Sequence, residues 1–218
     1  MAPRRRNGGY EHESVEFGRV VSFSDGMFAI AMTLLVVTIA APAIDDKDSV
    51  GALADALAEM ESQVISFFIS FAVIGRYWIA HHTFFSQLKG IDNGLISLNL
   101  IYLAFVAFLP FPTDVLGTYF ENPLAVTLYA VSVAIVSGLE VVLFRHAHRN
   151  ELLTRRWPDD VYRWQMVTSL LPVGLFALSI PIAYVSTVAA ACSWALAFPI
   201  FAFAGRWKPA RADEFIRG

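Results

Sequence analysis

The sequence predicts an all-α membrane protein with six transmembrane helices in each subunit. Of its 218 residues, 56% are hydrophobic and only 16% are charged, whereas soluble domains carry about 25% charged residues. The mean hydropathy is +0.55. Apolar stretches also recur along the chain, and most are close to the roughly 20 residues that a helix needs to cross a hydrocarbon core.

The first predicted span covers residues 19–41 and carries one carboxylate, Asp25, near its start. A charge is costly in lipid, so Asp25 is expected to face protein or water. At about 100° per residue, Ile30, Leu34 and Val37 fall within about 60° of arc, and Asp25 lies about 140° away. The stripe could be ordinary helix packing, and Asp25 could be a paired structural carboxylate.

The remaining spans follow from hydropathy and from the positions of proline. After an acidic connection, Asp48 or Ser49 is placed to cap the second helix, which begins amphipathic and therefore projects beyond the membrane. The motif Leu109-Pro110-Phe111-Pro112-Thr113 ends the third span. Polar connections are expected over 81–93 and 145–163, and the apolar segments are 64–80, 95–109, 124–144 and a pair within 165–205 that turns near 181–186.

The distribution of charge predicts the orientation in the membrane. With a cytoplasmic N-terminus and six spans, 15 of the 16 basic residues fall on the cytoplasmic side and only Lys47 lies outside. This asymmetry satisfies the positive-inside rule, so both termini are predicted to be cytoplasmic in a multi-pass protein. The apolar run after Arg4, Arg5 and Arg6 is too long for a signal peptide, so no cleavage is expected.

Several kinds of chemistry have no support in the sequence. The single cysteine, Cys192, excludes an intramolecular disulfide and a cysteine-based metal site. No Gly-rich phosphate loop, His-Glu-x-x-His pattern or nucleophile elbow is present. His146 and His148 lack a third ligand at metal-binding spacing and are expected in a solvated loop. We therefore predict no catalytic residues, no metal, no cofactor and no nucleic-acid partner.

The motif Arg19-x-x-x-Phe23-Ser24-Asp25-Gly26 on the first span resembles the signature of the transmembrane protein 175 family, the bacterial relatives of the lysosomal potassium channel. The resemblance covers the first three spans well and the last three by hydropathy alone. Further matches follow in order: Trp78-x-x-His81-His82-x-x-Phe85, Asp92, Asn99 and Leu109-Pro110-Phe111-Pro112-Thr113.

The resemblance implies a homotetramer in the plasma membrane that conducts potassium ions, either selectively or with a preference over other cations. One central pore at the oligomer axis would be lined by the first helices, with no re-entrant filter loop. By position, Ile30, Leu34 and Val37 would form stacked apolar rings and Thr33 a hydroxyl ring, giving a hydrophobic constriction. The chain then divides into a polar cytoplasmic N-terminus (1–17), a channel domain (18–206) and a cytoplasmic tail (207–218).

The resemblance also implies a hydrogen-bonded cluster that holds the first helix in place at the cytoplasmic end. The roles of His81 and His82 cannot be separated from sequence. A proton-coupled transporter using Asp25 and the two histidines remains an alternative, and a membrane enzyme using the histidines is a second one without a nucleophile or metal set nearby. The expected members of the cluster are Arg19, Phe23, Ser24, Asp25, Trp78, His81, His82 and Asn99.

Overall fold

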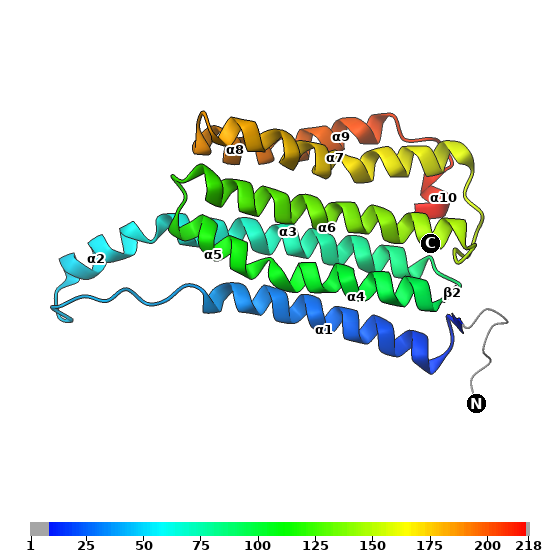
Figure 1. Cartoon of the computed structure of the whole chain (residues 1–218), viewed down its shortest axis with the longest axis horizontal. Helices are drawn as coiled ribbons and strands as arrows, with labels where there is room; N and C mark the ends of the chain where they lie inside the picture. The colour runs from blue at the N-terminus through cyan, green and yellow to red at the C-terminus, as the bar shows by residue number, and fades with distance from the viewer. Residues whose placement is uncertain (1–8, 217–218) are drawn as a thin grey trace.

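The computed structural model describes residues 9–216 and is built of helices that run alongside one another (Figure 1). Helix α1 lies on one side, α3, α4 and α5 come next, α6 follows, and α7, α8 and α9 form the far side. The elements are β1 (Tyr10–Glu11), α1 (Val15–Val37), α2 (Val50–Glu59), α3 (Glu61–Ser86), β2 (Gly90–Ile91), α4 (Asn93–Phe108), α5 (Pro110–Thr118), α6 (Pro123–Arg149), α7 (Asp159–Ala183), α8 (Thr187–Trp194), α9 (Ala197–Arg206) and α10 (Ala212–Ile216).

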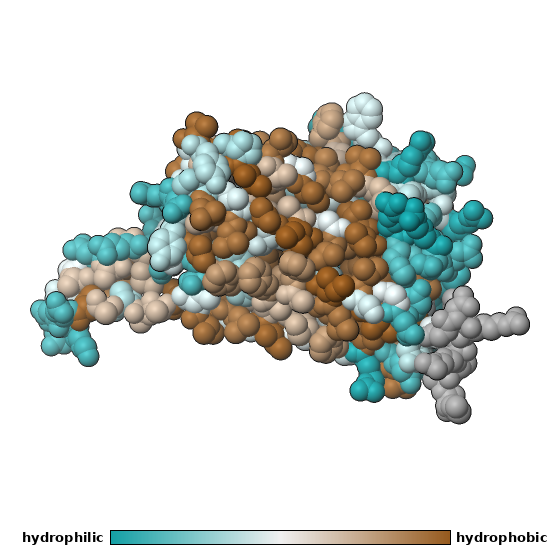
Figure 2. All heavy atoms as spheres, viewed as in Figure 1, coloured by the Kyte–Doolittle hydropathy of each residue, from teal (hydrophilic) through white to brown (hydrophobic). Residues whose placement is uncertain are grey.

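Within the described residues, five segments are long and apolar enough to cross a membrane: Val15–Val37, Glu61–Ser86, Asn93–Thr118, Pro123–Arg149 and Asp159–Ala183. Figure 2 shows the corresponding hydrophobic belt between two hydrophilic ends. The sixth predicted span is two short helices, α8 and α9, because Pro199 lacks an N–H and its ring conflicts with the carbonyl of Ala195. Together they run back along α7 (Figure 1), so a sixth crossing stays a prediction.

The prediction that the proline motif ends the third span was wrong. Leu109 keeps helical backbone angles (φ −54°, ψ −34°), and α5 continues from it, so one membrane segment runs from Asn93 to Thr118. Pro110 stands in the first turn of α5, where a missing N–H costs no hydrogen bond within that helix. The motif therefore joins two helices within one span.

Two predicted connections also proved to be helical. His81, His82 and Thr83 lie inside α3, which ends at Ser86, and α6 continues through Arg149 before a connection over 150–158. Both spans were predicted to end where polar residues begin. A helix can continue through such residues when their side chains face protein, as the buried His81 does.

The two ends of the bundle differ in how the chain next to α1 is held. Strand β1 pairs antiparallel with β2, with Tyr10 opposite Ile91, so the start of α1 lies beside the connection between α3 and α4. Gly90 makes this pairing possible, since a Cβ there would lie 2.5 Å from the Tyr10 carbonyl oxygen. At the other end, Ser49 caps α2, which has no buried residue and projects from the bundle (Figure 1).

Candidate pore helix and its polar cluster

Helix α1 has one face that packs against its own subunit. Its buried residues fall within about 60° of arc and contact α3, α4 and α5. Leu35 is 0% exposed, as expected for a side chain in the centre of that face. The buried set is Phe17, Ser24, Phe28, Ala31 and Leu35.

The opposite face of α1 is left uncovered by the subunit. Ile30, Leu34 and Val37 are 53%, 42% and 73% exposed, and Thr33 lies exposed among them. The Thr33 hydroxyl donates to the Ile30 carbonyl oxygen at 2.9 Å, which leaves its lone pairs facing outward. Phe23 is exposed on the same face. The chain thus presents an apolar stripe with one hydroxyl row, which only lipid, water or another subunit can cover.

Behind this stripe, three buried polar side chains join α1, α3 and α4. The Asn99 amide nitrogen donates to the Ser24 hydroxyl at 3.0 Å, and the Asn99 amide oxygen lies 2.8 Å from His81 Nε2. Because that oxygen can only accept, Nε2 carries the hydrogen in this arrangement. Ser24 passes its own hydrogen to the Val20 carbonyl oxygen at 2.9 Å. The chain of hydrogen bonds is complete, so it fixes how the three helices meet.

Aromatic rings enclose His81 on the sides that the hydrogen bond leaves open. The imidazole stacks on Phe85 with ring centroids 4.2 Å apart and on Tyr102 at 5.7 Å. Phe28 of α1 lies at 5.4 Å. The structure therefore separates the two histidines: His81 belongs to the buried cluster, while His82 is exposed and contacts the Trp78 ring at 5.8 Å.

Asp25 belongs to a second, more exposed contact. The Trp78 indole nitrogen donates to its carboxylate at 2.9 Å, linking α1 to α3 beside the buried cluster. The predicted cluster is thus divided in two. Arg19 is exposed, and in the described part of the chain no hydrogen bond or ion pair joins it to Asp25 or to the buried group.

Comparison with known proteins decides the family. A protein named a potassium channel in Streptomyces collinus is 33% identical over 176 residues, which cover 78% of this chain and 84% of that protein. This chain belongs to the TMEM175 family. The family profile described as endosomal/lysosomal potassium channel TMEM175 matches residues 19–110, so the family predicted from the motifs is confirmed.

Two further TMEM175 relatives bear on the fold and on the ion. The crystal structure of a lysosomal potassium-selective channel TMEM175 homolog from Chamaesiphon minutus matches with a TM-score of 0.73 and 29% identity, covering 88% of this chain and 99% of that one. The human endosomal/lysosomal proton channel TMEM175 is 33% identical over 117 residues, which are 51% of this chain and 23% of the human protein.

The profile match in this TMEM175 chain includes every residue of both contacts. It begins at Arg19, the first residue of the signature, and ends at Pro110, just beyond α4. The polar residues that connect α1, α3 and α4 therefore lie in the part of the chain that carries the family signal. Helices α6 to α9 lie outside it.

A hydrogen bond between a histidine and a carboxylate, at the end of the bundle that holds β1 and β2, was not predicted from the sequence. His146 Nε2 lies 2.9 Å from one Asp92 carboxylate oxygen and 3.1 Å from the other, and Asp92 also accepts the Leu95 N–H at 2.6 Å as the cap of α4. Gly94 permits this approach, since a Cβ there would lie 2.7 Å from the imidazole. The expectation of a solvated loop at His146 was wrong because His146 lies in the last turns of α6, next to the N-terminus of α4.

A second polar chain crosses the other half of the bundle. The Thr113 hydroxyl donates to Ser70 at 2.8 Å, and Ser70 donates to the Tyr129 hydroxyl at 3.0 Å, joining α5, α3 and α6. All three side chains are buried. No group of three or more metal-ligating side chains occurs among the residues that the structure describes.

Proposed function

We propose that this chain is a potassium-selective or potassium-preferring cation channel of the plasma membrane, and that it works as a homotetramer without enzymatic activity. The Streptomyces relative and the solved Chamaesiphon homolog are named as potassium channels. The fold supports the same function, since α1 stands at one side of the bundle (Figure 1) and carries a stripe of exposed apolar side chains.

That uncovered stripe is the observation that carries the proposal. In a tetramer with α1 at the axis, four copies of Ile30 would face one another, with rings of Leu34 and Val37 toward the outer end. Rings of aliphatic side chains exclude water when narrow and can close a pore by dewetting. A ring of Thr33 hydroxyls would supply oxygen atoms that replace part of an ion's hydration shell.

The arrangement of the two ends of the bundle supports an orientation with both termini in the cytoplasm. The described N-terminal residues, the connection over 150–158 and α10 all lie at the same end (Figure 1), as an even number of crossings requires. With α8 and α9 as one interrupted crossing, the count is six. Basic residues gather at this end, and the positive-inside rule supports a cytoplasmic position for it. The bilayer then surrounds the hydrophobic belt of Figure 2.

Flux from liposomes tests the function directly. Purified protein is reconstituted, and efflux is measured with outward gradients of potassium, sodium or protons imposed one at a time. We expect a membrane potential that follows the potassium gradient at fixed pH and a smaller response to sodium. A potential that depends only on the proton gradient, or potassium movement that requires it, would refute a potassium channel and favour the proton-coupled transporter.

Proton permeation is a second candidate, because the human relative is named a proton channel. The same liposomes loaded with a pH-sensitive dye separate the two ions. Acidification driven by a proton gradient with potassium absent would establish a proton path. Its abolition in an Asp25→Asn variant with unchanged potassium flux would place that path at the carboxylate.

A further inference from the structure

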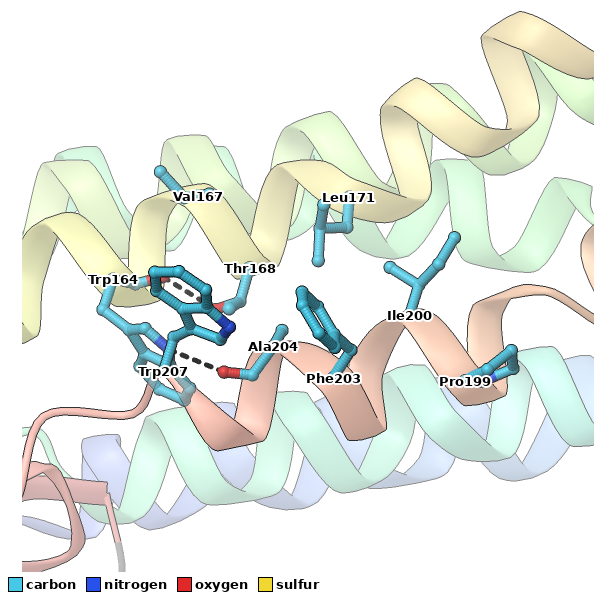
Figure 3. A pocket seen from close by; sticks show the side chains of 9 residues that line it. All are labelled: Trp164, Val167, Thr168, Leu171, Pro199, Ile200, Phe203, Ala204 and Trp207. Carbon is cyan, nitrogen blue, oxygen red and sulfur yellow. Dashed lines mark hydrogen bonds between the residues drawn. The ribbon is translucent and has the colours of Figure 1, made fainter.

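An apolar groove of about 440 Å³ runs between α7 and α9 on the outside of the bundle. Figure 3 shows Leu171 from α7 and Phe203 and Ile200 from α9 pointing into the space between the two helices. The Trp164 indole donates to the Ala204 carbonyl oxygen at 3.2 Å and closes one end of the groove. Its walls offer nothing polar to a ligand along most of their length.

The end of the groove that holds Trp164 and Trp207 is polar and basic. Lys208 places its ammonium 5.9 Å from the centre of the Trp164 ring. Arg163 is exposed next to Trp164 along α7, and Arg206 is exposed in the last turn of α9. Asp159 and Asp160 lie about one helical turn before Trp164 on α7, so the three basic residues outnumber the two acidic ones near the tryptophans. Tryptophan with basic residues is typical of the membrane interface.

The groove lies on the side of the bundle that faces away from α1. Helices α7 and α9 form one outer layer and α1 the other (Figure 1), and α1 packs on α3, α4 and α5. If α1 faces the oligomer axis, the groove faces the lipid. In this respect the inference rests on the proposed function. Its charged end lies with α10 and the described N-terminal residues, at the cytoplasmic surface.

We infer that this groove binds an anionic phospholipid of the cytoplasmic leaflet. One acyl chain would lie along Leu171, Phe203 and Ile200, and the headgroup phosphate would meet Lys208 and Arg206. Basic side chains near the surface attract anionic headgroups. The positive charge at one end of the groove matches an anionic headgroup, and the apolar walls match an acyl chain. An apolar transmembrane helix of another protein would match the walls but not the basic end.

Quenching of tryptophan fluorescence by brominated lipids tests the inference on the full-length protein, without measuring flux. Vesicles contain either phosphatidylglycerol or phosphatidylcholine with the same dibrominated acyl chains at equal mole fraction. The fluorescence of the two groove tryptophans is the emission of the unaltered chain minus that of a Trp164→Phe/Trp207→Phe variant in the same vesicles. We expect that fluorescence to be quenched more strongly by phosphatidylglycerol.

The headgroup contact is tested by Arg206→Gln/Lys208→Gln, with Arg145→Gln/Arg149→Gln on α6 as the matched control at the same end of the bundle. The preference for phosphatidylglycerol should fall by about fivefold for each charge removed from the groove, and the control pair should leave it unchanged. The preference is the ratio of quenching by phosphatidylglycerol to quenching by phosphatidylcholine for one and the same variant. A change in the emission of Trp164 caused by the substitution affects both measurements equally and therefore cancels.

Three results would overturn the inference. Equal quenching by the two lipids would show a groove filled by any acyl chain, and an equal effect of the control pair would show general surface attraction. Absence of groove quenching by either lipid would show that protein covers the groove. A failure of the liposome flux assay alone would refute the proposed channel and leave the quenching result standing.

Discussion

At the scale of single residues, the buried hydrogen bonds among Ser24, Asn99 and His81 make the packing of three helices sensitive to substitution. Each of the three side chains comes from a different helix, and each hydrogen bond is made away from water. Removing one member leaves at least one buried polar atom without its partner, which costs more than the hydrogen bond itself contributes. A buried polar group of this kind specifies one way of packing the helices.

Asn99→Leu should therefore destabilise the protein, since it keeps the volume but leaves the His81 N–H unpaired. We expect a loss of about 1 to 3 kcal/mol in the free energy of unfolding, measured by titration with sodium dodecyl sulfate in mixed micelles. Ser97→Ala, an exposed change in the same helix, should stay within about 0.5 kcal/mol. A similar small effect for Asn99→Leu would show that the hydrogen bonds are not formed.

Ile30→Asn tests the pore face of α1. If Ile30 stands at the axis, a polar side chain should wet the constriction and raise potassium flux from liposomes. Leu35→Asn is the control, because Leu35 is fully buried in the subunit and an unpaired amide there costs about 1 to 3 kcal/mol. It should lower the yield of folded protein without raising flux. A rise in flux with Leu35→Asn and none with Ile30→Asn would show that the proposed pore face of α1 is the wrong one.

At the scale of elements, close packing of α5 on α3 depends on a missing side chain. A Cβ at Gly117 would lie 2.9 Å from the Cα of Gln63, and the Gly117 carbonyl oxygen accepts from the Ser62 hydroxyl at 2.7 Å. The backbone of α3 cannot give way as a flexible side chain would. The two helices must separate if any larger residue replaces this glycine.

Gly117→Ala should thus cost about 1 to 3 kcal/mol in the free energy of unfolding. Gly138→Ala in α6 is the matched change, since a Cβ there meets nothing within 4 Å. It should stabilise the protein by up to about 1 kcal/mol through helix propensity alone. The same detergent titration measures both variants, and equal effects would contradict the close approach of α5 to α3.

The sequence could predict those features of the helices that depend on residues close together in the chain. Hydropathy located the apolar segments, and Ser49 marked a helix start that the structure confirms. The ends of α3 and α6 were misplaced because polar residues near a span were taken to mark its end. His81 and His146 instead lie within helices, where they form hydrogen bonds with Asn99 and Asp92. Those partners lie 18 and 54 residues away, and no local pattern encodes such pairings.

At the scale of the whole molecule, the topology separates the acidic end from the basic end. Cysteines introduced at Asp46 and Glu121 in a Cys192→Ser background should react with an impermeant maleimide added to intact cells. One introduced at Arg155 should react only after the membrane is opened. All three native side chains are exposed, so access depends on sidedness alone. Equal labelling of the three in intact cells would rule out two cytoplasmic termini.

The hydrogen bonds of α1 also have a mechanical consequence. In the described residues, its side chains bond to other helices only through Ser24 and Asp25, and β1 ties the preceding chain to β2. Beyond Asp25, the helix is held by apolar contacts, which resist sliding and tilting far less. Helix α1 is therefore held firmly only near Ser24 and Asp25, and Val37 lies about 18 Å further along the helix. If α1 lines a pore as proposed, small rotations of the helix at Asp25 would therefore produce the largest changes in pore radius near Val37.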